Sequence, residues 1–243
     1  MIWEEKYSIP SYICDRTDHL ALWGMARLFQ EVAEHHSSRT GIGFKTMIKK
    51  DQVWVLMRMY YHIYHMPAVD DVVTARTWSR GCDGVQFYRD YEMTDAEGNP
   101  YITGTTMWVI ITYSNRKLCR AKEYVDGYEH HPERQATTRE SLRRLIFPKD
   151  VTLNMSKEIS VIDSMIDHNN HVNNAEYIKM VSNNIVDLNL PNENYCFEIN
   201  YQQETQYGDK LQLNRVLEND NVWLQFLNSQ GISTTAKIYP FVK

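Results

Sequence analysis

The densest group of polar side chains in this sequence lies at residues 167–177, which read Asp-His-Asn-Asn-His-Val-Asn-Asn-Ala-Glu-Tyr. Asp167, Asn169 and His171 alternate along an extended or turning segment, so their side chains can face one side of a cleft. Such a group can fix an imidazole tautomer, orient a carbonyl and offer helix N-terminal amides to a developing anion. A simple helix cap with a polar turn is the alternative, but one cap does not use so many asparagines. The segment therefore predicts a catalytic site at the start of a helix.

Two helices are expected to position such groups. Apolar residues at helical spacing predict a long amphipathic helix over residues 22–33, with Asp18 as its N-cap and Gly41 just past its end. A second helix is expected over residues 177–186, ending before Leu190-Pro191.

An antiparallel meander is expected after each helix. The chain there is rich in Val, Ile, Thr, Tyr and Trp, and turn residues separate the runs. The expected strands are 53–63, 72–78, 86–94 and 101–113 in the first half, and 195–201, 210–217, 222–227 and 232–242 in the second half.

The same order of elements in both halves indicates an internal repeat. Asp15 and His19 precede Asp167 and His171 by 152 residues each. The copies differ where chemistry is expected, because Glu204 of the second copy falls opposite an apolar residue of the first. This asymmetry predicts catalysis in the second unit and binding of an apolar ligand in the first.

Residues 128–149 between the repeats are polar and basic, with a short helix expected at 140–146. We divide the chain into an N-terminal unit (1–127), this linker (128–149) and a C-terminal unit (150–243). Two similar units favour a pseudo-dimer, and its exposed sheet edges could pair again in a homodimer.

Composition excludes several classes of protein. The 26 basic and 31 acidic residues give a net charge of −5, so no global field would gather nucleic acid or anionic membrane. No apolar run is long enough to span a membrane, and the first residues lack the pattern of a secretory signal. The four single cysteines and the scattered His pairs do not have metal-ligand spacing, so we expect no metal, no cofactor and a cytoplasmic location.

Short motifs in both halves match, as a set, those of one enzyme family. They are Asp-x-Asn-x-His-Val-Asn-Asn-x-x-Tyr at 167–177, Tyr-Gln-Gln-Glu at 201–204, Gly-Asp at 208–209, Phe-Gln-Glu-Val-Ala at 29–33, Val-Trp-Val-Leu-Met-Arg at 53–58, Thr-Trp at 77–78 and Trp-Val at 108–109. Together they resemble the acyl-acyl carrier protein (acyl-ACP) thioesterases over essentially the whole chain. The resemblance implies an α+β double hotdog fold, in which two long helices are each wrapped by an antiparallel sheet.

The resemblance also implies an active-site group, carried over residue by residue as Asp167, Asn169, His171 and Glu204. Plant members of the family often have a cysteine directly after the glutamate, and Thr205 stands there in this chain. A thiolate nucleophile at that position is therefore excluded.

Thioester hydrolysis needs a nucleophile, proton transfer and stabilisation of an oxyanion. We expect attack by water with Glu204 as general base, its pKa raised toward neutrality by the cleft, and with His171 sharing the proton transfer. Asn169 would orient the substrate or the water, and Asp167 would hold His171 or the loop. Direct attack by the carboxylate through an anhydride stays open.

The oxyanion is expected to meet main-chain amides around Val172 and Asn173 at the helix N-terminus. The expected partner is an acyl carrier protein bearing an acyl-phosphopantetheine group. Its acidic surface would meet one of the basic clusters, either residues 45–50, residues 116–122 or the linker arginines. An acyl-coenzyme A thioesterase, a non-catalytic acyl-binding protein and a hotdog dehydratase are the alternatives.

Overall fold

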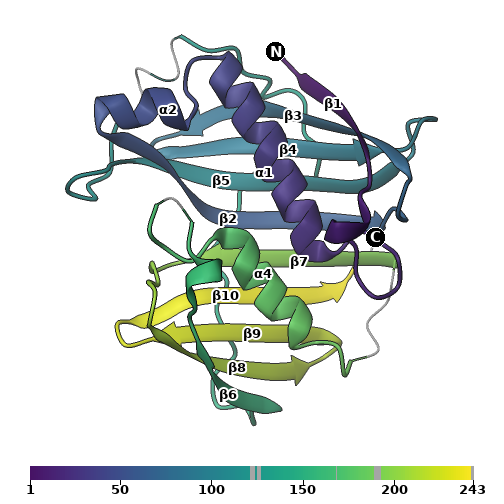
Figure 1. Cartoon of the computed structure of the whole chain (residues 1–243), viewed down its shortest axis with the longest axis vertical. Coiled ribbons are helices and arrows are strands. Elements are labelled where there is room, and N and C mark those ends of the chain that lie inside the picture. Colours follow the sequence, from purple (N-terminus) through teal and green to yellow (C-terminus); the bar gives the residue numbers. More distant parts are fainter. Residues whose placement is uncertain (121–123, 125–126, 168, 189–192, 242–243) are drawn as a thin grey trace.

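The chain forms one continuous antiparallel sheet in the computed structural model, which describes residues 1–120, 124, 127–167, 169–188 and 193–241. The strands follow the order β1-β3-β4-β5-β2-β7-β10-β9-β8-β6 across the sheet (Figure 1). They are β1 (Trp3–Ser8), β2 (Gln52–His65), β3 (Val72–Asp83), β4 (Gln86–Thr94), β5 (Pro100–Thr112), β6 (Met155–Ser160), β7 (Glu193–Tyr201), β8 (Lys210–Glu218), β9 (Asn221–Asn228) and β10 (Gly231–Pro240).

The two halves join where β2 pairs with β7, with Tyr61 opposite Phe197. Helix α1 (Leu22–Arg39) covers the first half of the sheet and α4 (Asn174–Asn183) covers the second half, on the same face (Figure 1). The α+β double hotdog expected from the sequence is therefore confirmed. The shorter helices are α2 (Phe44–Met47), η1 (Ser11–Ile13), η2 (Ile48–Lys50) and η3 (Asp163–Met165).

The core lies between the helices and the sheet. Phe29 of α1 stacks on Tyr61 of β2, with ring centroids 5.5 Å apart, and lies 4.9 Å from the ring of Tyr91 on β4. All three side chains are buried, which fixes α1 over the centre of the first half. None of the helices in the described part of the chain is long and apolar enough to cross a membrane.

The ends of α1 match the sequence prediction at one terminus only. Gly41 has a φ of +78° and donates its N–H to the Ser38 carbonyl at 3.2 Å, so it ends the helix as expected. Asp18 is not the N-cap. Ala21 takes that position, and Asp18 lies in the preceding turn with a φ of 59°.

The turn before each helix confirms the internal repeat. The Asp15 N–H donates to the His19 carbonyl at 2.8 Å, and the Asp167 N–H donates to the His171 carbonyl at 2.9 Å. The same backbone turn therefore precedes α1 and α4, although it carries different side chains in the two copies.

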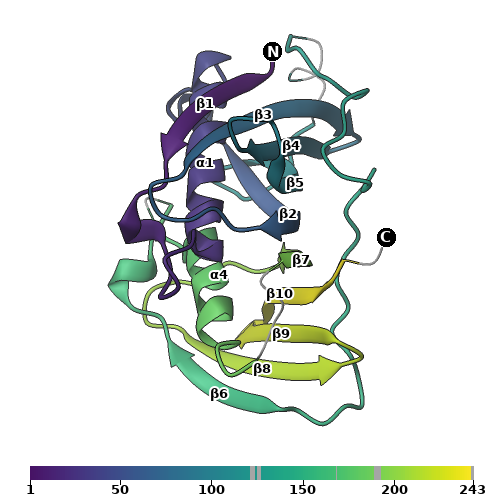
Figure 2. The same ribbon diagram turned by 90° about the vertical axis from the view of Figure 1, so that its right-hand side faces the viewer.

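The segment between the halves runs along the face of the sheet opposite the helices (Figure 2). The helix expected at 140–146 does not form there. Leu142 is buried against the outer face of the sheet, its carbonyl accepts a hydrogen bond from Arg58, and the Leu145 N–H donates to Asn200. These contacts hold the segment extended, and they outweigh its local preference for helix.

The edge strands β1 and β6 were not expected from the sequence. Both are short and half-exposed, with Glu or Lys at several positions, which weakens the alternation that marks a strand. The expected end of the second helix at Leu190-Pro191, and the last residue of the final strand, lie outside the described residues. The division at 1–127, 128–149 and 150–243 stays a prediction, since the sheet runs without interruption through both halves.

Candidate active site

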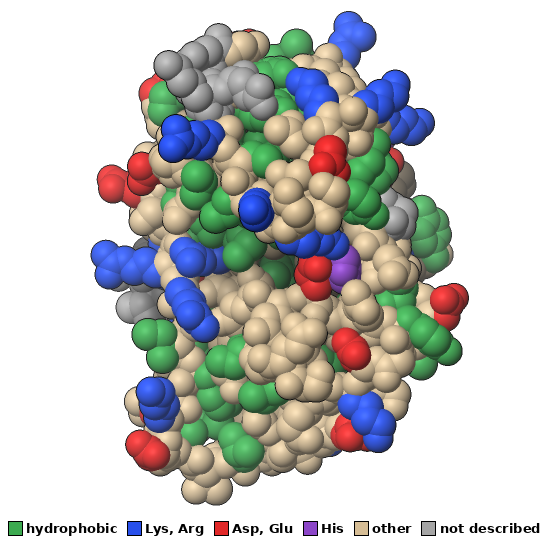
Figure 3. Space-filling model, turned by 90° about the vertical axis from the view of Figure 1, so that its left-hand side faces the viewer, with side chains coloured by type: hydrophobic (Ala, Val, Ile, Leu, Met, Phe, Trp, Pro, Cys, Tyr) green, Lys and Arg blue, Asp and Glu red, His purple; other side chains and the backbone are tan. Residues whose placement is uncertain are grey.

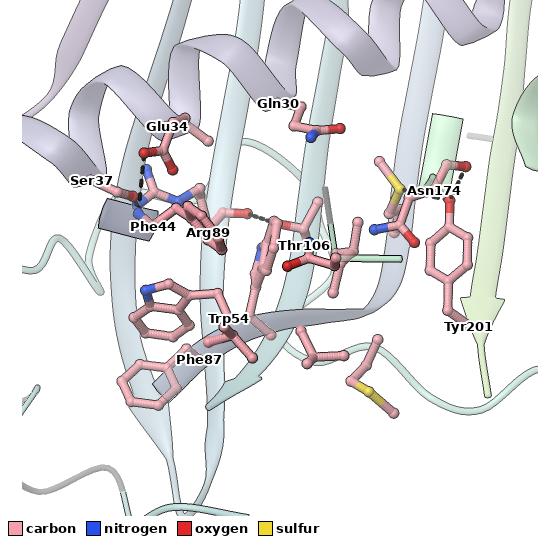
Figure 4. Close-up of a pocket in the computed structure, with 18 of the residues that line it drawn as sticks. Gln30, Glu34, Ser37, Phe44, Trp54, Phe87, Arg89, Thr106, Asn174 and Tyr201 are labelled. Carbon is pink, nitrogen blue, oxygen red and sulfur yellow. Dashed lines mark hydrogen bonds between the residues drawn. The ribbon is translucent and has the colours of Figure 1, made fainter. Parts of the chain in front are cut away.

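A cavity of about 630 Å³ lies between α1 and the sheet and extends to the start of α4. Its wall includes all four residues proposed from the sequence: Asp167, Asn169, His171 and Glu204. On the face of the molecule in Figure 3, a histidine lies beside an acidic and a basic side chain at the edge of a hollow. Figure 4 shows the interior of the cavity beneath α1.

The loop that carries His171 is fixed by Asp167. One carboxylate oxygen of Asp167 accepts the Asn169 N–H at 2.8 Å, and its carbonyl accepts the Asn170 N–H at 2.9 Å. Asn170 has a φ of 65°, a conformation that asparagine tolerates better than most residues. Of the two roles considered for Asp167, these contacts support holding the loop.

Helix α4 begins at this loop, and Asn173 is its N-cap. The Asn173 side chain accepts the Ala175 N–H at 2.9 Å. The N–H groups of Val172 and Asn173 are already bonded, to the carbonyls of Thr205 and Met165, both at 2.9 Å. The expectation that these two amides hold the oxyanion is therefore wrong.

The next amide along the chain is that of Asn174, at the first position of α4. This N–H makes no hydrogen bond to any of the described residues. Asn174 also lines the cavity, so the helix N-terminus still offers a donor to an anion there, one residue further on than the sequence indicated.

His171 and Glu204 meet at the mouth of the cavity. The Nε2 of His171 lies 3.0 Å from Oε2 of Glu204, and Arg116 Nη2 lies 3.2 Å from the same oxygen. The His171 side chain is only 14% exposed, whereas those of Glu204 and Arg116 are 45% and 37% exposed. The three groups form a cluster with its carboxylate facing the solvent side of the mouth.

The pKa of Glu204 is lowered in this cluster, chiefly by the hydrogen bond from His171 and also by the charges of His171 and Arg116. Burial acts in the opposite direction and is outweighed. The expectation of a carboxylate tuned upward is wrong in direction. Glu204 is therefore ionised at neutral pH.

Arg116 is the member of the cluster that sequence reasoning did not place there. It lies in the turn after β5, has a φ of 59°, and its guanidinium lies 5.4 Å from the ring centroid of Tyr113. Asp51 holds the same turn by accepting the Ser114 N–H at 3.0 Å. In sequence, Arg116 is simply one of several basic residues, and only the β2–β7 junction brings its turn to the second half.

A buried hydroxyl network supports the segment that carries Glu204. Thr205 is 1% exposed, and its Oγ1 lies 2.7 Å from the Tyr177 hydroxyl and 2.9 Å from the Ser233 hydroxyl. Asn228 donates to the Glu204 carbonyl at 3.1 Å. Thr205 therefore holds the segment in place.

Comparisons with known proteins agree with the resemblance found in the sequence. Residues 1–128 match the family model of the acyl-ACP thioesterase N-terminal domain, and residues 148–237 match that of the C-terminal domain. Among curated proteins, oleoyl-acyl carrier protein thioesterase 2, chloroplastic, of Arabidopsis thaliana is 29% identical over 96% of this chain, which spans 68% of that protein. Oleoyl-acyl carrier protein thioesterase 1 of the same plant is 29% identical over 85% of this chain, which spans 61% of that protein.

The fold is shared with the crystal structure of an acyl-ACP thioesterase from Bacteroides thetaiotaomicron. The TM-score is 0.83 at 19% identity, covering 98% of this chain and 97% of that chain. Since the two family models cover the first half and most of the second, this chain belongs to the acyl-ACP thioesterase family.

Proposed function

We propose that this chain hydrolyses the thioester of a fatty acyl group carried by acyl carrier protein, releasing the free fatty acid and the thiol of the carrier. The observation that carries this proposal is the contact of His171 with Glu204 at the mouth of a cavity that runs beneath α1. An acyl chain would enter the cavity while its thioester stays at the mouth.

The catalytic group is Glu204 with His171. The ionised carboxylate takes a proton from water as the water oxygen attacks the thioester carbon, and the sulfur leaves as a thiol after protonation. His171, held at 3.0 Å, orients the carboxylate and shares the proton transfer. Arg116 adds to the lowering of the Glu204 pKa that His171 causes. Attack by the carboxylate itself through an anhydride is the alternative, which incorporation of labelled water oxygen into Glu204 would identify.

The oxyanion that forms on the former carbonyl is placed at the N-terminus of α4. The Asn174 N–H and the positive end of the helix supply the stabilisation there. Asn169, whose side chain lines the cavity, orients the substrate or the water. Asp167 holds the loop that carries Asn169 and His171.

The two units have different roles in this proposal. Residues 1–127 bind the acyl chain, since α1 and β2 supply the deep wall of the cavity, and residues 150–243 supply the catalytic group. The partner is acyl carrier protein with its phosphopantetheine arm. The reaction takes place in the cytoplasm, where the four free cysteines stay reduced. The homodimer considered from the sequence stays a prediction.

Purified protein should release free thiol from acyl-ACP, measured beside the matching acyl-coenzyme A esters. Glu204→Gln and His171→Ala should each lower kcat by about 10²- to 10⁴-fold, the share that one proton-transfer group supplies. Circular dichroism and thermal unfolding of both variants control for folding. Release of no thiol from either carrier would refute the proposed function.

A further inference from the structure

Arg89 places a cation deep inside the cavity proposed to hold the acyl chain. It lies on β4 beneath α1 (Figure 4). Its Nη1 donates to Nδ1 of His36 at 2.9 Å and to Oγ1 of Thr77 at 3.3 Å, and its Nη2 donates to Oγ of Ser37 at 3.2 Å. His36 accepts as a neutral imidazole, because burial and then the charge of Arg89 lower its pKa to about 3. The guanidinium is thus held by uncharged groups.

The Arg89 guanidinium keeps unused hydrogen-bonding capacity. It has five N–H donors, and three hydrogen bonds account for three of them. Among the described residues no carboxylate oxygen lies within ion-pair distance. The charge of Glu34, which also lines the cavity, acts on Arg89 without a direct ion pair. The Glu34 carboxylate accepts the Ser38 hydroxyl at 2.8 Å. Two donors therefore remain for water inside the cavity.

Sheet register places Arg89 in a row of cavity-lining residues that crosses the strands, and Ser79 on β3 continues the row beyond it. Arg89 is opposite Thr106 on β5, and Thr106 is opposite Met59 on β2. Tyr201 lies at the end of β7, next to the start of α4, where its hydroxyl donates to the Asn174 carbonyl at 3.0 Å. Figure 4 shows Arg89, Thr106 and Tyr201 in this order across the cavity. A chain that enters beside Tyr201 and crosses the strands therefore meets Arg89 on β4 before it can reach the last part of the cavity.

The distance along this row indicates how many carbons of an acyl chain lie between β7 and Arg89. From β7 to β4 there are three strand spacings, which is about 14 Å at ~4.8 Å each. An extended alkyl chain advances about 1.25 Å per carbon, from a C–C bond of ~1.5 Å and a near-tetrahedral angle, so about 11 carbons span the row. A dodecanoyl chain would reach the guanidinium, and a hexadecanoyl chain would have to cover it.

Covering Arg89 with a methylene chain is unfavourable because it removes water from two N–H donors and gives them no acceptor. We propose that Arg89 sets the upper limit of acyl-chain length in this enzyme, by keeping the cavity around its guanidinium hydrated. This inference rests on the proposed function and adds a specificity-determining residue to it. His36, Ser37 and Thr77 act as positioning residues, since they hold the guanidinium in place.

The rival explanation is that Arg89 recognises an oxygen atom at the far end of the acyl chain. The carboxylate of Glu34 on the same wall disfavours a chain that ends in a carboxylate, because the two like charges would repel. A chain ending in a hydroxyl group has no such conflict, and the experiment must separate it from the chain-length limit.

The test is a profile of kcat/KM for acyl carrier protein loaded with octanoyl, dodecanoyl, hexadecanoyl and ω-hydroxydodecanoyl chains. Wild-type protein should prefer dodecanoyl to hexadecanoyl. Arg89→Met and Arg89→Gln, which remove the charge, should raise the hexadecanoyl-to-dodecanoyl ratio at least about tenfold, the change expected from one unsatisfied donor. Arg89→Lys, which also frees space but keeps the charge, should leave the ratio within about threefold. Arg76→Met, on β3 and outside the cavity wall, is the matched control.

An unchanged ratio in both neutral variants would overturn the inference, as would a wild-type preference for hexadecanoyl chains. Equal gains in the Met and Lys variants would also overturn it, because space alone would then explain the limit. A preference for the ω-hydroxy chain that is lost in Arg89→Gln would replace it by recognition of oxygen. If Arg89→Met fails to fold by circular dichroism, Arg89→Gln carries the comparison. Octanoyl-ACP hydrolysis by every variant shows that the proposed function itself stands.

Discussion

Replacing Arg116 with Met tests whether this residue lowers the pKa of Glu204. Arg116 Nη2 lies 3.2 Å from the Glu204 carboxylate, and two unit charges at this distance attract by about 1.3 kcal/mol in a medium as polar as water. Both side chains are more than a third exposed, so solvent and salt reduce the contribution to about 0.5–1 kcal/mol. This energy is the magnitude that the experiment should detect.

The direction of the effect follows from the linkage between charge and protonation. Arg116 is one of the groups that lower the pKa of Glu204, so its removal raises that pKa. A general base must be deprotonated, and activity is therefore lost as the pH falls through this pKa. In Arg116→Met the loss should begin at higher pH. At a fixed pH on the acid limb, kcat/KM should be about two- to fivefold below wild type.

The assay is a pH profile of kcat/KM from pH 3 to 7, which includes the acid limb of a glutamate whose pKa is lowered. The substrate is a small acyl thioester such as acyl-N-acetylcysteamine, which removes any effect on carrier docking. The difference in the pKa of the acid limb between wild type and Arg116→Met should become smaller at high salt, because the Debye length falls to about 3 Å at 1 M. Lys117→Met, on the same turn and with no ion pair among the described residues, is the control. An acid limb that does not move, or that moves to lower pH, would refute the role given to Arg116.

Three further predictions concern the groups around the cluster. Asn173→Ala removes the N-cap of α4 and should lower the free energy of unfolding by about 1 kcal/mol, measured by urea denaturation, with Asn183→Ala at an exposed position of the same helix as the comparison. Thr205→Ala should lower kcat by less than about tenfold, because one positioning bond is far smaller than a general base, and loss of all hydrolysis in a folded variant would contradict attack by water. Gly104→Ala would bring a Cβ within 2.1 Å of the Tyr61 ring, so the free energy of unfolding should fall by about 1–3 kcal/mol, as is typical of overpacking, and urea denaturation should show it.

The repeated elements could be predicted from the sequence because their patterns are local. Each strand of the two meanders was found within a few residues, since β-branched and aromatic residues alternate between turns there. The turn of the candidate active site could be predicted for a similar reason. Asp167, Asn169 and His171 lie within one short segment, and the structure brings Glu204 to them as expected.

The sequence predictions that proved wrong concern features that depend on contacts between residues far apart in the chain. Asp18 has the side chain of a cap, but the turn puts Ala21 at the start of the helix. The segment at 140–146 has helical composition, but the outer face of the sheet binds it in an extended form. The pKa of Glu204 is lowered chiefly by its hydrogen bond to His171, which is 33 residues away in the chain. Arg116 also lowers it from 88 residues away, and approaches it only through the β2–β7 junction. No local pattern carries that information.

Because the two copies are joined in one chain, their sequences need not be identical, as those of the subunits in a homodimer must be. In an assembly of identical subunits, any substitution that shapes the hydrophobic tunnel would also appear beside the reactive carboxylate. Here Glu204 and Met66, the apolar residue that the sequence repeat aligns with it, are free to differ. In the proposed function, the first copy can change its selectivity for acyl-chain length while the second keeps the groups that cleave the thioester. Selectivity and turnover can therefore be altered by mutations in separate parts of the gene.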